Sequence, residues 1–590
     1  MFPSRACFNL PTHRSAAPVI RTAICCLMAA FHSLFAAEVP NFTLLDYNGA
    51  PHELHRADGR AVVLFFTGIG CPVARKNAGK LVELKKQFGP EVTVWMVDSE
   101  AGVDRDSARN EAQELGVSDL PFLLDGNQAL ALALGVERTA ETIVIDAKEW
   151  SVIYRGALDD QFSEGNEKAE PGTRFAALAV AAHLGGNPVL TARTPVKGCL
   201  ISYEKTAAQS GELISYSKQI APILQKHCVD CHSEGDIGPF AFSNYNVVKR
   251  KARMIEEVLL TQRMPPWHAD PHYGKFANDV SIAAPDVQTL LGWIRQGAPR
   301  DEEKDPLSEP LAARPDWQLG APDYIIKLPQ PEQIPATGVV NYRHIKLDSP
   351  VPEDAWLAAT VVRPGNRKVL HHAIVYAKFE GSGDEPGGTG VKIAGWAPGR
   401  LPRRLPEGTG IFLGKGAKLD IELHYTTNGT PQTDQTEIGL YLLREKPKSA
   451  YKTGMAIKLD FSIPANEPNA QTSAAFVFQR DSFLYALTPH MHVRGSWMKY
   501  EAQFPDGRRE TLLSVPRFDF NWQTSYGLAK PLRMPAGTKI ICTGAFDNSV
   551  KNLSNPDPNK VVHWGQQSWD EMFIGYVGYV EVPVEPACDK

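Results

Sequence analysis

The sequence predicts a multidomain protein whose fold class changes along its 590 residues, from an α/β domain through a small all-α domain to two all-β domains. Three observations support this prediction. Between Glu38 and about Gly185, continuous apolar runs typical of buried strands alternate with segments of helical period. A single apolar stripe of helical spacing follows near residue 290. From Ala321 onward, short apolar runs are separated by Gly, Pro, Asn and Asp, which predicts β-sandwich or jelly-roll-like domains.

The first segment, residues 1–37, has the pattern of a secretory signal peptide. Arg14 and Arg21 precede an apolar run over residues 23–37, and this run ends in small residues. The run is short for a membrane span, so we expect cleavage after Ala37 and no stable span in the mature chain. An uncleaved anchor is the alternative. The mature protein is therefore predicted to be periplasmic or secreted.

Charge and cysteine content exclude one class of partner and indicate the compartment. The formal net charge is −5 and no basic block is present, which argues against nucleic-acid binding. Of the nine cysteines, three lie in the signal-like segment and two in a motif described below. The other four are even in number, as expected for disulfides in an oxidising compartment, and their pairing stays open. These four are Cys71, Cys199, Cys542 and Cys588.

The first domain is predicted over residues 38–190 and has an α/β pattern. The apolar run at residues 61–66 predicts a buried strand, which leads through a short loop to Cys71. A helix is expected directly after Cys71, so this thiol stands at a helix N-terminus, where the helix dipole favours the thiolate. Further strands are predicted at residues 92–97, 142–146 and 151–154, the last two forming a hairpin.

This order of elements resembles the thioredoxin-like redoxin domains. Two positions depart from a working dithiol exchanger: Ala74 replaces the second cysteine of C-x-x-C, and Ala140 stands where a proline usually precedes the hairpin. Cys71 is therefore a candidate redox thiol with three alternatives: a single-thiol peroxidase, a copper-handling thiol, or a domain kept for docking, which is favoured. Cys199, just beyond the domain, could cross-link to Cys71, although the geometry is not readable from sequence.

A C-x-x-C-H motif indicates a covalently bound haem. Cys228 and Cys231 each add to a vinyl group of the porphyrin, and His232 ligates the iron as an axial ligand. The alternatives are a zinc half-site and a redox dithiol. A zinc site needs a second Cys/His pair at suitable spacing, and none follows in the sequence. The sequence therefore predicts one c-type haem.

Met264 is the candidate for the second axial ligand of this haem. It lies in a proline-rich loop downstream of the motif, and His/Met ligation raises the reduction potential and suits electron transfer. If Met264 only packs, His268 or His272 could ligate the iron instead.

The surrounding residues, 212–302, resemble a small class I-like cytochrome c domain, which is all-α. Linkers are predicted on either side, at residues 191–211 and 303–320. Pro and charged residues accumulate in the second of these linkers. The closing helix is predicted from an apolar stripe at i, i+3, i+4 and i+7, formed by Val287, Leu290, Leu291 and Ile294.

The histidines of the C-terminal half are candidate metal ligands. His490 and His492 are two residues apart, so on a strand their side chains share one face and the residue between them points away. Adjacent His371 and His372 would point to opposite faces of a regular strand, so joint ligation requires a strand end or a twist. A lone strand histidine such as His424 is more often structural than a ligand.

Together these histidines resemble the copper type II, ascorbate-dependent monooxygenases, the family of peptidylglycine α-hydroxylating monooxygenase and dopamine β-monooxygenase. The resemblance implies two β-sandwich copper domains, at residues 321–452 and 453–590. In that family the first domain holds copper through a His-His pair and a later histidine, and the second through His-x-His and a distant methionine. The matching residues form copper site 1, with His371, His372 and His424, and copper site 2, with His490, His492 and Met572.

The resemblance implies two copper ions and hydroxylation of an activated C–H bond by O2. Imidazole serves both copper oxidation states and a thioether prefers Cu(I), so site 2 is the expected catalytic centre and site 1 the electron-transfer centre. The haem would pass single electrons to site 1. Expected partners are a small-molecule or peptide substrate, O2, and a one-electron donor such as a cytochrome, a quinol-linked chain or ascorbate.

Two alternatives to monooxygenation remain. One is a copper and haem protein that binds copper or transfers electrons without oxygenase activity, and the other is a thiol peroxidase centred on Cys71. Relatives often carry a cysteine directly after the methionine ligand, where this chain has Phe573. The resemblance therefore leaves Cys542 without its usual partner and makes Cys588 a candidate.

Overall fold

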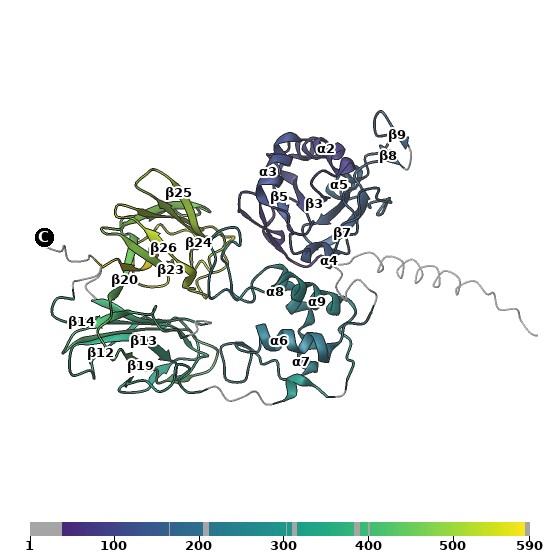
Figure 1. The fold of residues 1–590 in the computed structure, drawn as a ribbon. Helices are drawn as coiled ribbons and strands as arrows, with labels where there is room; N and C mark the ends of the chain where they lie inside the picture. Colours follow the sequence, from purple (N-terminus) through teal and green to yellow (C-terminus); the bar gives the residue numbers. More distant parts are fainter. Residues whose placement is uncertain are drawn as a thin grey trace, which may run out of the picture. The chain divides into compact units, whose positions relative to one another are not determined.

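The chain forms two compact units, one of residues 1–41 with 57–203 and the other of residues 42–56 with 204–590. An α/β region, a helical region and a largely β region follow one another along the chain (Figure 1), as the sequence predicts. No helix among the described residues is both long and apolar enough to cross a bilayer. The expected signal peptide and Cys588 lie outside the described residues. The computed structural model describes residues 38–163, 166–203, 212–302, 304–309, 315–382, 390–398 and 402–583.

The first unit is built on a mixed sheet of β3 (Ala61–Thr67), β4 (Val92–Asp98), β5 (Phe122–Leu124), β6 (Glu141–Asp146) and β7 (Ser151–Ala157). These strands lie in the order β5-β4-β3-β6-β7. Strands β3, β4 and β5 are parallel, and β6 and β7 form the predicted antiparallel hairpin. Every residue of β3 is buried, as expected for a central strand of a helix-covered sheet. Short hairpins elsewhere are β1 (Thr43–Asp46) with β2 (Pro51–Glu53), and β8 (Phe162–Ser163) with β9 (Asn166–Glu167).

Helices pack on this sheet and one of them positions Cys71. The helices of this unit are α2 (Pro72–Phe88), η2 (Gly89–Glu91), α3 (Arg105–Glu114), α4 (Ala129–Leu134) and α5 (Phe175–Leu184), whereas η1 (Leu54–Arg56) belongs to the other unit. Helix α2 contacts β3 and β4, and α5 contacts β3, β6 and β7. Cys71 is the N-cap residue of α2, and Pro72 occupies the first helical position, where its missing N–H costs no hydrogen bond.

The second unit begins with a helical region of η3 (Tyr216–Ile220), α6 (Ala221–His227), α7 (Tyr245–Arg250), α8 (Ala252–Leu260), α9 (Ala284–Arg295) and η4 (Pro306–Ser308). The predicted stripe of α9 is present, because Val287, Leu290 and Leu291 are buried. Tyr216 packs against the ring of Trp293 from α9, with 5.9 Å between ring centroids. The aromatic and aliphatic side chains thus form a small core of their own.

The first β half contains β10 (Tyr324–Lys327), β11 (Glu332–Ile334), β12 (Arg343–Asp348), β13 (Ala355–Arg363), β14 (Leu370–Lys378), β15 (Val391–Trp396), β16 (Thr409–Leu413), β17 (Lys418–Tyr425), β18 (Gln432–Asp434) and β19 (Glu437–Leu442). One sheet has the order β12-β17-β14-β15, and the other contributes β10-β19-β13-β16. Apolar residues of both sheets share one core, as in a sandwich.

The second β half contains β20 (Ser449–Lys458), β21 (Ser462–Ile463), β22 (Ala470–Val477), β23 (Ser482–His490), β24 (Gly495–Gln503), β25 (Arg509–Val515), β26 (Tyr526–Met534), β27 (Lys539–Phe546), β28 (Val562–His563) and β29 (Phe573–Glu581). Its sheets are β22-β27-β24-β25 and β20-β29-β23-β26, again around one core. Parallel pairing of β16 with β20 joins the two halves into a continuous eight-stranded sheet.

Candidate functional site

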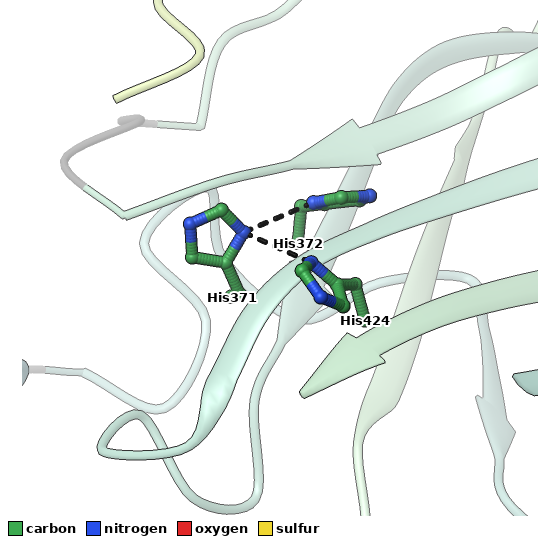
Figure 2. A group of neighbouring side chains, drawn as sticks. All are labelled: His371, His372 and His424. Carbon is green, nitrogen blue, oxygen red and sulfur yellow. Dashed lines mark hydrogen bonds between the residues drawn. The ribbon is translucent and has the colours of Figure 1, made fainter. Parts of the chain in front are cut away.

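His371, His372 and His424 bring three ring nitrogens together on β14 and β17. Nδ1 of His371 lies 3.2 Å from Nδ1 of His372 and 3.2 Å from Nδ1 of His424 (Figure 2). A ring nitrogen carries either one proton or one lone pair, so Nδ1 of His371 cannot satisfy both neighbours by hydrogen bonding. An ion with metal–nitrogen bonds of about 2.0–2.1 Å holds its nitrogen ligands roughly 3.3–3.6 Å apart. The three residues could therefore hold a metal ion.

A β-bulge lets the adjacent histidines face the same way. In the pairing of β14 with β17, Leu370 lies opposite Tyr425 and His372 lies opposite His424. Between these two pairs the chain moves by two residues along β14 but by only one along β17, so His371 is the extra residue of the bulge. Bulges re-aim side chains, so both imidazoles reach one side of the strand. The irregularity that joint ligation requires is thus present, at the start of β14.

His490 and His492 form a second group at the end of β23, with 5.4 Å between their ring centroids. Nδ1 of His492 donates to the carbonyl of Asp570 at 3.2 Å, and Nδ1 of His490 lies 2.5 Å from Oε1 of Gln523. Bonds at Nδ1 set the tautomer and leave Nε2 of each ring for a metal. Nε2 of His492 is buried and has no hydrogen-bond partner among the described residues. Met491, between them, is fully buried in the apolar core.

Met572 directly precedes β29 and is half-buried. Its neighbour Glu571 is fully buried and accepts the backbone N–H groups of His492 at 2.8 Å and of Arg494 at 2.6 Å. Burial raises the pKa of Glu571 to about 8 despite these bonds. The carboxyl group of Glu571 thereby ties the segment that carries Met572 to the loop that carries His492.

The five imidazoles of both groups are buried and uncharged at neutral pH. Burial lowers the pKa of His371 and of His490 to about 4, and that of His492 to about 3. Burial and the neighbouring imidazoles lower the pKa of His424 to about 2 and lower that of His372 strongly. Neutral imidazole is the form that ligates metals. The donor set therefore fits copper, which accepts imidazole in both oxidation states.

Tyr342 and Phe520 lie between the two histidine groups. The ring centroid of Tyr342 is 4.5 Å from that of His424 and 6.5 Å from that of His492. Phe520, from the second β half, stacks on His371 at 4.9 Å and lies 5.9 Å from His492. The sequence analysis did not identify either residue, because both lie outside regular elements and belong to no motif. For Gln523 likewise no sequence signal exists, whereas Glu571 adjoins the predicted ligand Met572.

The C-x-x-C-H motif forms a turn that continues from α6. The N–H of His232 donates to the carbonyl of Cys228 at 3.0 Å, and Nδ1 of His232 lies 3.1 Å from the carbonyl of Phe240. That bond leaves Nε2 for an iron ion, and the ring packs against both Phe240 and Phe242, which also contact each other. Burial raises the pKa of Cys228 to about 12. These residues fit the attachment of a c-type haem.

Met264 lies in the loop after α8 and is half-buried. Its N–H donates to the carbonyl of Val258 at 3.3 Å. Of the alternatives, His268 is buried, and burial together with the charge of Arg517 lowers its pKa to about 4. His272 is exposed and its ring packs on that of the next residue. Met264 stays the predicted axial ligand, with His268 and His272 as the alternatives.

Cys71 meets Cys199 in the first unit. Their Sγ atoms lie 3.2 Å apart, although 128 positions separate the two residues in the chain. The hydroxyl of Thr139 lies 3.0 Å from Sγ of Cys71. The two thiols, for which the sequence allowed a cross-link, therefore lie close together in the structure. No motif in the sequence indicates the role of Thr139.

Comparison with known proteins identifies the first domain. Residues 36–168 match the Redoxin family, so the predicted thioredoxin-like redoxin domain is confirmed, and this domain suggests thiol–disulfide redox activity. No match to a copper monooxygenase or a cytochrome c covers the remaining residues, so those two resemblances stay predictions. No curated protein matches the sequence.

Solved structures similar to the chain each cover less than a third of its length. An uncharacterized conserved protein from Geobacillus kaustophilus is 27% identical over 29% of this chain and 94% of its own, with a TM-score of 0.27. A hypothetical protein from Sinorhizobium meliloti 1021 is 25% identical over 29% and 95%, with a TM-score of 0.27. A thioredoxin-like protein from Aeropyrum pernix is 17% identical over 24% and 92%, with a TM-score of 0.19.

Proposed function

We propose that this chain is a copper-dependent monooxygenase that hydroxylates an activated C–H bond with O2, and that electrons reach it through a covalently bound c-type haem. The observation that carries the proposal is the presence of two groups of buried, neutral imidazoles on either side of Tyr342 and Phe520. Clustered imidazoles without a partner are costly to bury, and a bound cation removes that cost. The first group has the ligand spacing of a metal site, and the second presents an unpartnered Nε2.

The residues divide into two ligand sets, each with its own role. His371, His372 and His424 would hold the electron-transfer copper, and His490, His492 and Met572 would hold the catalytic copper, where the thioether favours Cu(I). Bound copper supplies one-electron redox chemistry and O2 activation. Per turnover, one oxygen atom enters the product, the other becomes water, and two electrons are consumed. Gln523 and the Asp570 carbonyl orient the imidazoles of the second set.

The segment after Met264 supports electron delivery from the helical region. Trp267 packs on Tyr526 with 4.9 Å between ring centroids. Tyr526 begins β26, which pairs with β23, the strand that ends at His490. The N–H of Ala277 also donates to the carbonyl of Gly527 at 2.8 Å. One aromatic contact and one backbone hydrogen bond therefore join the segment after the predicted haem ligand to the second β half.

The proposed setting follows from the same features. Covalent haem attachment and the signal-like segment both favour a periplasmic or secreted protein without a stable membrane span. The substrate is proposed to be a small molecule or a peptide. The electron donor is a cytochrome, a quinol-linked chain or ascorbate.

The test is metal and haem analysis of the full chain, made in a host that attaches c-type haem, followed by oxygen uptake against a panel of C–H substrates. We expect two copper ions, one haem, and uptake that depends on substrate and yields a hydroxylated product. His424→Ala should lose one copper ion and stop turnover. His344→Ala is the matched control, because His344 lies on β12 of the same half and contacts Asp420 rather than the histidine group.

Two results would contradict the proposal in different ways. A protein that carries two copper ions and haem, yet shows no substrate-dependent oxygen uptake with any donor, is an electron-transfer or copper-binding protein. A protein that binds no copper at either histidine group refutes the metal sites themselves.

A further inference from the structure

A segment at the end of the first unit covers the Cys71 region as a short extra strand. This strap, residues 198–203, lies beyond the part that matches the Redoxin family. The N–H of Thr139 donates to the carbonyl of Cys199 at 2.9 Å, and the N–H of Ile201 donates to the carbonyl of Glu137 at 2.9 Å. An antiparallel bridge joins Arg138 to Leu200 between these bonds. The strap therefore pairs with residues 137–139, in the connection between α4 and β6, through the kind of backbone bonds by which an extended peptide adds a strand.

The strap places the second thiol where a disulfide can form. The 3.2 Å between Sγ of Cys71 and Sγ of Cys199 must shorten to about 2.05 Å for a disulfide. Two thiolates on one tetrahedral zinc ion, with Zn–S bonds of about 2.3 Å, stand roughly 3.7 Å apart. The pair is thus closer than metal ligation requires, which favours a dithiol–disulfide couple over metal handling.

The Thr139 hydroxyl contacts both cysteines and lowers the pKa of Cys71, which makes Cys71 the better leaving group when a Cys71–Cys199 disulfide is attacked. Oγ1 of Thr139 accepts the N–H of Cys199 at 2.9 Å, and its own proton lies within reach of Sγ of Cys71 at 3.0 Å and of the carbonyl of Cys199 at 3.4 Å. Burial alone raises the pKa of Cys71, but bonds from Thr139, from the N–H of Ala74 and from Cys199 lower it on balance. The bond with Cys71 raises the pKa of Cys199.

Exposure distinguishes the two sulfurs as well. Cys71 is 5% exposed, because it lies at the buried N-terminus of α2, whereas Cys199 is exposed. A partner can therefore reach Cys199 but not Cys71 while the strap is in place.

We propose that Cys71 and Cys199 form a reversible disulfide that oxidises a pair of thiols on an extended segment of a partner protein, with Cys199 as the attacked sulfur. This inference stands on the first unit alone and does not depend on the copper proposal. It reverses the expectation of an inert docking domain, since the second thiol comes from the strap instead of from a C-x-x-C motif.

The exchange balances in two steps. One thiol of the partner dithiol loses its proton and attacks Sγ of Cys199, the Cys71–Cys199 bond breaks, and Cys71 leaves as a thiolate, helped by its lowered pKa. The second thiol of the partner loses its proton and attacks the partner sulfur of the mixed disulfide, and Cys199 leaves and takes up a proton. Two electrons pass from the partner dithiol to the protein disulfide, and one proton is released.

The first experiment uses the full haem-loaded chain, oxidised with glutathione disulfide and mixed with one equivalent of a reduced dithiol peptide. We expect peptide mapping to find the Cys71–Cys199 disulfide, which is replaced by a peptide disulfide in a single turnover. Cys199→Ser and Cys71→Ser should each abolish the exchange. Cys542→Ala is the matched control, because this third thiol is buried in the second unit, and it should leave the exchange unchanged.

A second experiment tests the strap without removing a thiol. A Cβ at Gly198 would overlap the carbonyl of Thr139, so Gly198→Ala should displace the strap, slow disulfide formation and speed alkylation of Cys71. Gly79→Ala, on α2 with open space around its Cβ, is the control. Thr139→Val should raise the pH at which Cys71 is half alkylated, and Thr139→Ser should restore it.

Three outcomes would overturn the proposal. One is an oxidised protein in which Cys71 and Cys199 stay unlinked although wild-type protein is folded by circular dichroism. Another is a Cys199→Ser protein that oxidises the peptide as fast as wild type. The third is peroxide consumption that needs Cys71 and not Cys199, which would identify a single-thiol peroxidase.

Discussion

Replacement of Asp98 by Asn is expected to change how the stability of the first unit depends on pH. Asp98 ends β4 and is fully buried beneath the loop that leads to Cys71. Its carboxylate accepts the N–H groups of Ile69 at 3.2 Å and of Glu100 at 2.9 Å. Burial nevertheless raises the pKa of Asp98 to about 7, and the charge of Glu100 adds to the effect. The folded protein therefore keeps this proton at pH values where the unfolded chain has lost it.

The sign and size of the effect follow from linkage. With a folded pKa of about 7 against an ordinary value of 3.8, the native state binds more protons than the unfolded state between these values. The free energy of unfolding therefore falls as pH rises from about 4 to 7, by up to ~1.4 kcal/mol per pH unit. The total is on the order of 4 kcal/mol, which is a large part of the stability of a domain.

The assay is urea unfolding of the full chain at pH 5 and pH 8, with proteolysis used to score fragments from residues 57–203. Wild type should be more stable at pH 5, and Asp98→Asn should lose most of that difference. Asp119→Asn is the matched control at an exposed position of the same unit. The reasoning is refuted if Asp98→Asn keeps the pH dependence of wild type, because the buried carboxyl group would then not be its source.

Three further predictions concern two glycine positions, one in each unit, and copper binding by the second unit. A Cβ at Gly575 would overlap Sγ of the buried Cys542, so Gly575→Ala should lower the free energy of unfolding by about 1–3 kcal/mol or more. Gly79→Ala on α2 should instead raise the free energy of unfolding of the first unit by about 0.5–1 kcal/mol. The urea midpoint of each unit measures the two effects. Copper added after chelation should stabilise the second unit by about 2.7 kcal/mol at a hundredfold excess over Kd. An unchanged midpoint with copper would argue against ligation by the buried histidines.

Local patterns were enough to predict the elements that depend on neighbouring residues in the chain. The apolar run at residues 61–66 became the buried strand β3, and the stripe around Leu290 became α9, because burial follows directly from such periods. The redoxin domain could be recognised for the same reason. The two cores of the β halves also follow from short apolar runs, although the β16–β20 pairing that joins them does not.

The rest depends on register and on residues far apart in sequence. The bulge at His371 arises from how β14 pairs with β17, and a strand sequence carries no sign of that register. Phe520 and Tyr342 reach the histidines from irregular segments, so their roles depend on tertiary contacts alone. The strap was only suggested by the position of Cys199, because its pairing with residues 137–139 involves no motif.

The stacking of Phe520 on His371 has a consequence for biosynthesis. The ribosome completes the first histidine group when it reaches His424, whereas Phe520 is translated only later. Because domains generally fold as units during synthesis, with the N-terminal ones first, the first sandwich presents its three imidazoles, beside Tyr342, before Phe520 can cover His371. A metal ion can therefore bind to the nascent protein. Docking of the second half then places Phe520 over His371 and restricts access to the bound ion. Chelation of a fully folded chain should accordingly be slower than chelation during its synthesis.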